Sequence, residues 1–154
     1  MDGVSRAITL GDVAAVKAIF LEYMAFIEDF LGQCLGFQGT DAEFKHFPHK
    51  YDALLLASID DEPVAACGIK PLRDDICELK RLYCRPTGRG HNLGERLTRE
   101  SLKQAKQLGY NHMYLDTDPG LIPANKIYEA LGFKDIDRYY DNPMGCSRYM
   151  ALAL

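Results

Sequence analysis

Apolar residues recur along the chain at two spacings, one typical of helices and one typical of strands. Helical spacing runs from Val13 to Ile27, with Asp12 as the expected N-cap, and returns over residues 93–108. A third helix is expected from Pro123 to Leu131. Short apolar runs between these helices predict the strands Ser5–Thr9, Ala53–Ile59, Val64–Ile69, Cys77–Cys84, His112–Asp116, Lys134–Tyr140 and Ser147–Leu152.

Turns and irregular segments separate the elements. The run Asp60-Asp61-Glu62-Pro63 predicts a hairpin, and Asn142-Pro143 with Gly145 predicts a turn before the last strand. Residues 28–50 look irregular, apart from a short helix expected near Asp41–His46. The order β-α-(α)-β-β-β-α-β-α-β-β predicts an α/β (α+β) fold, with a mixed sheet and helices on both faces. The buried stripe of the second helix is expected to contain Leu93, Leu97, Ala105 and Leu108.

Composition narrows the class of protein. A chain of 154 residues with 47% hydrophobic and 26% charged residues suits one globular domain, residues 1–154. No apolar run approaches a membrane span and the N-terminus lacks the pattern of a signal peptide, so no membrane association is expected. The five cysteines contain no CxxC pair and read as reduced thiols, which indicates a cytoplasmic location. A net charge of −4 gives no reason to expect nucleic acid as a partner.

Residues 85–97, RPTGRGHNLGERL, carry the clearest chemical signal. An extended segment leads into a Pro- and Gly-rich turn that opens a helix, and helix N-termini favour phosphate or pyrophosphate groups. The P-loop spacing is absent. In the dinucleotide fingerprint G-x-G-x-x-G the third glycine would fall on Leu93, one residue before Gly94. An ordinary helix start with a flexible entry loop remains the alternative for this stretch taken alone.

Two segments together resemble the GNAT acetyltransferase superfamily. RGHNLG (89–94) is similar to its coenzyme A pyrophosphate loop, [R/Q]-x-x-G-x-[G/A], and ANKIYEALGF (124–133) is similar to its second motif, A-x-x-x-Y-x-x-x-G-F. The departure is Asn92, where the family usually has glycine. Asn tolerates positive φ, so the turn can form if Asn92 adopts it. The resemblance implies a GNAT-like, mostly antiparallel sheet of about six or seven strands with helices on both faces.

The resemblance also implies which residues hold the acyl donor, acetyl-CoA. Backbone groups of the strand before the loop should pair with the pantetheine arm, and amides of the loop should bind the pyrophosphate. The implied cofactor-binding residues are Leu82, Tyr83, Cys84, Arg89, Gly90, His91, Asn92, Leu93, Gly94, Glu95 and Asn125.

Two catalytic residues follow from the same resemblance. Tyr128 matches the family's general acid, although its position also suits an ordinary core tyrosine. Glu78 lies four residues before Leu82 and is therefore expected on the same strand face as Leu82 and Cys84, where family members carry a general base. A surface ion pair with Lys80 or Arg81 is the alternative role for Glu78.

The remaining candidates are less specific. His46 and His49 superficially resemble a metal pair, but Pro48 interrupts any helix between them, so no metal site is expected. Tyr23, Phe26 and Phe30, with Tyr139 and Tyr140, are candidates for an acceptor pocket or for ordinary core positions.

The function expected from the resemblance is transfer of acetyl from acetyl-CoA to a primary amine of a small molecule, amino-acid-like or polyamine-like. The alternatives are acetylation of a protein lysine or N-terminus, and a non-catalytic acyl-CoA sensor. A homodimer formed by pairing of an exposed C-terminal strand, Arg148–Leu154, is a further expectation.

Overall fold

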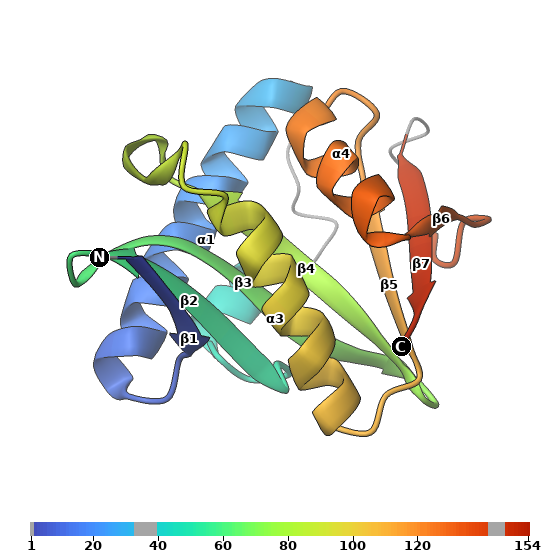
Figure 1. Ribbon diagram of the computed structural model, residues 1–154, viewed down its shortest axis with the longest axis horizontal. Coiled ribbons are helices and arrows are strands. Elements are labelled where there is room, and N and C mark those ends of the chain that lie inside the picture. The colour runs from blue at the N-terminus through green and yellow to red at the C-terminus, as the bar shows by residue number, and fades with distance from the viewer. Residues whose placement is uncertain (1, 33–39, 142–146) are drawn as a thin grey trace.

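A single seven-stranded sheet organises the computed structural model, which describes residues 2–32, 40–141 and 147–154 (Figure 1). The strand order is β1-β2-β3-β4-β5-β7-β6, and every neighbouring pair is antiparallel except β4 and β5. The predicted mixed, mostly antiparallel sheet is thereby confirmed. In chain order the elements are β1 (Asp2–Arg6), α1 (Leu10–Leu31), α2 (Thr40–Lys45), β2 (Ala53–Ile59), β3 (Glu62–Arg73), β4 (Ile76–Cys84), α3 (Leu93–Gln107), β5 (His112–Thr117), α4 (Ile122–Leu131), β6 (Lys134–Asp135) and β7 (Arg148–Ala153).

Helices cover both faces of the sheet, as predicted. In Figure 1, α3 crosses in front of the sheet while α1 lies behind it. On the α3 face, Leu93, Leu97 and Ala105 join a core with strand residues and with Tyr128 of α4. On the α1 face, a second core is built around Phe20. Leu108, expected in the α3 stripe, is instead 41% exposed, because the helix has already ended at Gln107.

The first helix begins and ends at other residues than predicted. Thr9, and not Asp12, is the N-cap: its Oγ1 accepts the Asp12 backbone N–H at 3.0 Å. Thr9 therefore cannot belong to the first strand, which ends at Arg6. The helix also continues through residues 28–31, predicted as irregular, until Gly32 ends it with φ 66°.

Strand lengths differ at the C-terminal half of the sheet. β6 contains only Lys134 and Asp135, and the rest of the predicted strand up to Tyr140 is not a strand. β7 lies between β5 and β6, so the C-terminal strand is not the edge expected to pair across a dimer. The turn predicted around Asn142-Pro143 and Gly145 lies outside the described residues.

The feature that positions the site is the separation of β4 from β5. Their parallel pairing joins only residues 76–78 to residues 112–114. Beyond Glu78 and Tyr114 the two strands continue without pairing to Cys84 and Thr117. The C-terminal half of β4 therefore presents backbone groups to an opening in the middle of the sheet.

Candidate active site

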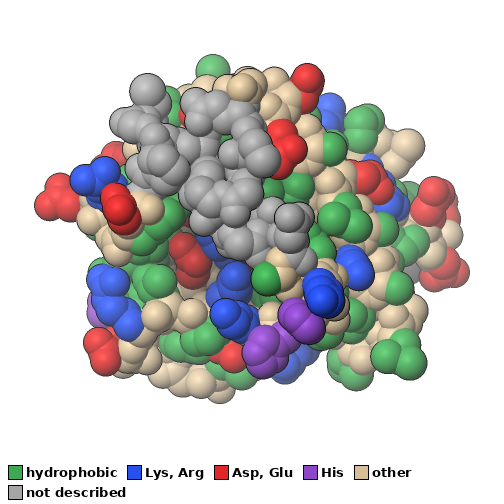
Figure 2. All heavy atoms as spheres, turned by 180° about the vertical axis from the view of Figure 1, so that it is seen from behind, with side chains coloured by type: hydrophobic (Ala, Val, Ile, Leu, Met, Phe, Trp, Pro, Cys, Tyr) green, Lys and Arg blue, Asp and Glu red, His purple; other side chains and the backbone are tan. Residues whose placement is uncertain are grey.

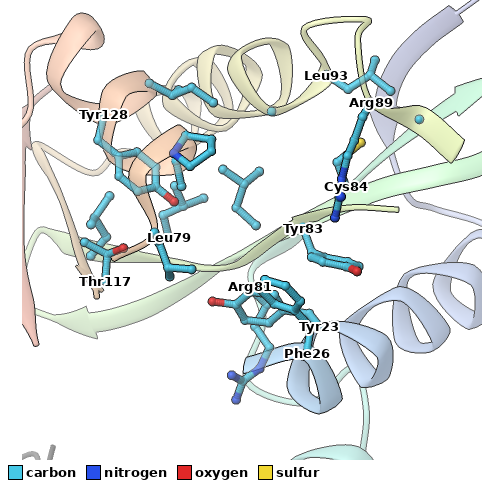
Figure 3. Close-up of a pocket in the computed structure, with 18 of the residues that line it drawn as sticks. Tyr23, Phe26, Leu79, Arg81, Tyr83, Cys84, Arg89, Leu93, Thr117 and Tyr128 are labelled. Carbon is cyan, nitrogen blue, oxygen red and sulfur yellow. The ribbon is translucent and has the colours of Figure 1, made fainter. Parts of the chain in front are cut away.

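A cavity of about 460 Å³ fills the opening between β4 and β5 (Figure 3). Tyr128 of α4 lines it from one side of the sheet, and Tyr23 and Phe26 of α1 line it from the other. Because residues from both faces border the same space, the cavity passes through the sheet. Of the predicted site residues, the cavity is lined by Leu82, Tyr83, Cys84, Arg89, Leu93, Gly94 and Tyr128.

A β-bulge interrupts β4 beside this cavity. The register with β3 shifts so that Ala66 faces Tyr83 but Gly68 faces Lys80, which leaves one extra residue on β4. Arg81, within the bulge, has φ 59°, a left-handed conformation that is unusual for a non-glycine residue.

The bulge reverses the alternation of side chains and overturns one prediction. Leu82 and Cys84 pack against the core on the α3 face. Glu78 is paired with Lys70, two residues beyond Gly68. A Cβ added to Gly68 would meet Phe20 and Tyr51, which lie on the α1 face. Glu78 therefore lies on the opposite face from Leu82, because spacing by even numbers keeps a face only where no residue is inserted.

A buried ion pair holds the bulge in place. The Arg81 guanidinium donates to both carboxylate oxygens of Glu43 in α2, at 3.0 and 2.9 Å, and both side chains are less than 10% exposed. Tyr51 donates a further hydrogen bond of 3.0 Å to Glu43. Desolvation alone would raise the pKa of Glu43, but the hydrogen bond and charge of Arg81 outweigh it and lower that pKa. Arg81 and α2 are thus fixed to each other at the cavity wall.

The helix α3 begins beside the cavity, which Leu93 and Gly94 line. Its N-cap, Asn92, has φ 57° and ψ 29°, which confirms that this position adopts positive φ, and its side chain makes no capping hydrogen bond. The N–H of Arg96 is the first to bond back, to Asn92 at 3.0 Å. The amides of Leu93, Gly94 and Glu95 precede it, so they are the donors that a helix N-terminus leaves for a ligand.

The side chains of the loop before α3 mostly point elsewhere. Gly90, His91, Asn92 and Glu95 do not line the cavity. The His91 ring and the Arg96 guanidinium contact the carboxylate of Asp2, at 3.4 and 3.0 Å, and Glu95 pairs with Arg99. The hydrogen bond from Arg96 is the largest cause of a lowered pKa at Asp2.

Tyr128 reaches the cavity from α4, with 7% of the residue exposed. Figure 3 shows its hydroxyl pointing into the space between the strands. Burial raises the pKa of Tyr128, so the phenol keeps its proton at neutral pH. Within the described part of the chain this hydroxyl has no hydrogen-bond partner, which leaves it available to a ligand.

Asn125, which is predicted to contact the cofactor, makes hydrogen bonds within the frame of the site. Its Oδ1 accepts from Thr117 Oγ1 and its Nδ2 donates to the Asp118 carbonyl, both at 2.9 Å. It is 4% exposed and does not border the cavity. These bonds tie the start of α4 to the end of β5 and so set the position of Tyr128.

Glu78 belongs to a cluster of charged and phenolic groups behind the cavity. Tyr139 donates a hydrogen bond to Glu78, and Tyr140 donates one of 2.7 Å to Asp116. The ammonium of Lys80 lies between the two carboxylates, 3.6 Å from Glu78 and 3.5 Å from Asp116. Sequence reasoning missed Asp116, which lines the main cavity; its position at the end of a strand beside a glycine turn was the available signal.

The aromatic residues of α1 that were candidates for an acceptor pocket differ in their positions. Tyr23 and Phe26 line the main cavity, whereas Phe30 is 46% exposed. Both histidines near Pro48 are exposed, and no group of three or more potential metal ligands occurs in residues 2–32, 40–141 and 147–154. Among the described helices, none combines the length and apolar character needed to cross a bilayer.

Comparison with known proteins agrees with this geometry. The sequence profile of the acetyltransferase (GNAT) family matches residues 16–133. An uncharacterized N-acetyltransferase of Schizosaccharomyces pombe is 35% identical over 149 residues, which cover 93% of this chain and 89% of that protein.

Solved structures share the fold at lower sequence identity. An acetyltransferase from Streptococcus agalactiae superimposes with a TM-score of 0.78 at 18% identity, over 99% of this chain and 98% of that one. The ribosomal-protein-S18-alanine N-acetyltransferase of Escherichia coli gives a TM-score of 0.71 at 18% identity, over 99% and 94% of the two chains.

Proposed function

The chain belongs to the GNAT family of N-acetyltransferases, and on that premise we propose that it moves an acetyl group from acetyl-CoA to a primary amine of a small molecule. The observation that carries the proposal is the uncapped N-terminus of α3 opening onto a cavity between two separated strands. The amides of Leu93, Gly94 and Glu95 would bind the pyrophosphate, with Arg89 adding positive charge. Leu82, Tyr83 and Cys84 would offer main-chain groups to the amides of the pantetheine arm.

The chemistry requires one group that gives a proton and one that takes a proton. The amine nitrogen forms a bond to the carbonyl carbon while the carbon–sulfur bond breaks, and the departing thiolate needs a proton. Tyr128 would supply it, since its neutral phenol points into the cavity and has no competing partner among the described residues.

The amine must lose a proton because only its neutral form attacks. We propose Glu78 as the base, acting through the cluster that it shares with Lys80 and Asp116, since its carboxylate lies behind the cavity wall. Asp116 is the second candidate because it borders the cavity itself. In the pH dependence of kcat/KM, the acidic limb should shift in Glu78→Gln if Glu78 is the base, and only in Asp116→Asn if Asp116 is.

Tyr128→Phe tests the assignment most directly. We expect kcat to fall about 100-fold, as is typical when a general acid is removed, while calorimetry gives an acetyl-CoA Kd within about twofold of wild type. Tyr110→Phe is the matched control, because the Tyr110 hydroxyl bonds to Asp52, far from the cavity, and should leave kcat unchanged. An unchanged kcat in Tyr128→Phe would remove Tyr128 from the acid role.

An acceptor panel tests the rest of the proposal. CoA release should be measured with small amines and, in parallel, with peptides that carry a free N-terminus or lysine. Turnover of peptides alone would replace the small-molecule acceptor by a protein. Binding of acetyl-CoA with no turnover of any amine would favour the sensor role.

The cytoplasm is the location we propose, because this reducing compartment suits the free thiols Cys67, Cys77 and Cys84.

A further inference from the structure

A second cavity, of about 290 Å³, lies on the face of the sheet that α1 and α2 cover. Arg81 borders both this space and the main cavity. Figure 2 views the molecule from this side and shows Lys and Arg side chains gathered near the middle of the face, beside Asp and Glu. We call this space the lysine cavity; its lining residues are Lys70, Leu72, Glu78, Lys80, Arg81, Tyr139, Tyr140 and Asp141.

The carboxylates around the lysine cavity already accept hydrogen bonds from neighbouring side chains. Glu78 accepts from Tyr139, and Asp116 accepts from Tyr140. Glu43, behind the wall, accepts from Arg81 with both oxygens and also from Tyr51. Only Asp141, exposed at the rim and screened by water, lacks such a role. Each of the other carboxylates is therefore already engaged by at least one donor, which leaves fewer acceptor sites for a second cationic group of a ligand.

The ammonium groups of Lys70 and Lys80, by contrast, keep hydrogen-bond donors that no carboxylate uses. Lys70 lies 3.6 Å from Glu43, and Lys80 lies 3.6 and 3.5 Å from Glu78 and Asp116. These separations exceed the 2.7–3.2 Å of ordinary N–H···O bonds, so the contacts balance charge without using the donors. Both side chains are mostly buried, with 21% and 14% exposed, so few water molecules can reach these donors.

The charges around Lys70 also favour a ligand group that is negatively charged. Burial lowers the pKa of Lys70, and the charges of Lys80 and Arg81 lower it further, although Glu43 acts against them. Lys70, Lys80 and Arg81 face Glu43, Glu78 and Asp116, so the buried cations and carboxylates balance three to three, and the exposed Asp141 lies at the rim. A zwitterion would leave this balance unchanged, whereas a polyamine would add cations to a site that already holds three.

We propose that the lysine cavity binds the carboxylate of the acceptor, which makes the acceptor an amine that carries a carboxylate, such as a free α-amino acid. The inference rests on the proposed function and names its acceptor class. Lys70 and Lys80 would donate to the carboxylate oxygens. One carbon away, the amino group would lie toward Asp116 and the main cavity, since Lys80 contacts both carboxylates at this junction.

Matched acceptors test the proposal. Several L-amino acids are each compared with the amine that lacks only the carboxylate, for example phenylalanine with phenethylamine and lysine with cadaverine, using release of CoA as the measurement. We expect kcat/KM to be at least tenfold higher for the acids. Equal or higher values for the amines without a carboxylate overturn the inference and leave the acetyltransferase proposal intact. Binding of acetyl-CoA without turnover of either group would instead count against the proposed function.

Substitution of Lys70 locates the effect. The ratio of kcat/KM for acid over amine should fall about tenfold in Lys70→Gln and recover in Lys70→Arg, which keeps the charge. Lys45→Gln is the matched control, since Lys45 is an exposed lysine of α2 that does not line the cavity, and its ratio should equal that of wild type. A ratio that stays unchanged in Lys70→Gln would overturn the assignment of the carboxylate to this cavity.

Discussion

The two long helices of this protein begin with nearly the same sequence but in different surroundings. α1 starts Thr9-Leu10-Gly11-Asp12 and α3 starts Asn92-Leu93-Gly94-Glu95, each with a polar cap, leucine, glycine and an acidic residue. Leu10 is 90% exposed, whereas Leu93 is 2% exposed. The first start faces solvent at the rim of the fold, and the second faces the cavity.

The backbone of the cap separates the two starts. Thr9 is extended and its hydroxyl accepts an amide of the first turn, so α1 satisfies part of its own N-terminus. Asn92 is left-handed and its side chain accepts none, so the α3 amides stay available. We therefore expect a helix start to bind an anion when its cap accepts none of its amides and a cavity lies before it. The four-residue pattern alone does not decide this.

Substituting the glycine that the two helix starts share should give the largest difference between them. A Cβ on Gly94 would lie 3.1 Å from Ile127 Cδ1, so the Gly94→Val side chain would crowd the gap between α3 and α4. We expect acetyl-CoA to bind about 100-fold more weakly, since about two charge-assisted bonds of roughly 1.5 kcal/mol each would be lost. Gly11→Val makes the same change in α1, where only Thr9 Oγ1 lies near, at 3.8 Å, and calorimetry should give wild-type affinity. Equal affinities in the two variants would place the pyrophosphate elsewhere.

Changing the backbone preference of residue 92 should have the next largest effect. In Asn92→Ala, alanine must hold φ 57° without a side chain that can form a local hydrogen bond. This should lower the free energy of unfolding by about 1–2 kcal/mol. Urea denaturation should show that loss, and acetyl-CoA affinity should fall several-fold as the loop relaxes. Asn92→Gly should keep both properties close to wild type, because glycine adopts positive φ freely. If Asn92→Gly lost as much stability and affinity as Asn92→Ala, the loop would depend on the Asn92 side chain and not on its φ.

Removing the cap of α1 should cost stability and leave binding intact. Thr9→Ala removes the acceptor of the Asp12 amide, a loss of about 1 kcal/mol in the free energy of unfolding. Calorimetry with acetyl-CoA should give the wild-type Kd within about twofold, since α1 contributes Tyr23 and Phe26 to the cavity more than three turns from Thr9. Thr9→Ser, which retains the acceptor, should restore the stability.

Features that depend on local chemistry could be predicted from the sequence. Positive φ at Asn92 follows from the tolerance of asparagine for that region and from its place between a glycine-rich turn and a helix. The order of elements follows from hydrophobic spacing, and the position of Tyr128 at the cavity agrees with the second family motif. Each requires information from only a short stretch of chain.

The face of Glu78 could not be predicted, because it depends on a partner far away in the sequence. Alternation along β4 holds until the bulge at Arg81, and Arg81 is held there by Glu43, 38 residues earlier. Nothing in ELKRLYC itself marks an inserted residue. For the same reason the lysine cavity was missed: Lys70 and Lys80 come from different strands, and Tyr139 and Tyr140 follow a β6 that was predicted to be longer.

Asp2 offers the smallest and most selective change to the α3 start. Its carboxylate contacts Arg96 and His91, so a negative charge already lies beside the amides proposed to bind pyrophosphate. Asp2→Asn should tighten acetyl-CoA binding about two- to threefold at low salt, with less effect at high salt, because exposed charges are screened. The lowered pKa of Asp2 keeps the carboxylate charged under mildly acidic conditions, so the gain should persist at pH 6. Asp12→Asn makes the same change in α1 and should leave the Kd unaltered. Weaker binding in Asp2→Asn would instead mean that Asp2 orders Arg96 for the ligand. The two helix starts would then differ in one more respect, because only the start of α3 would need an acidic residue from a neighbouring strand, β1.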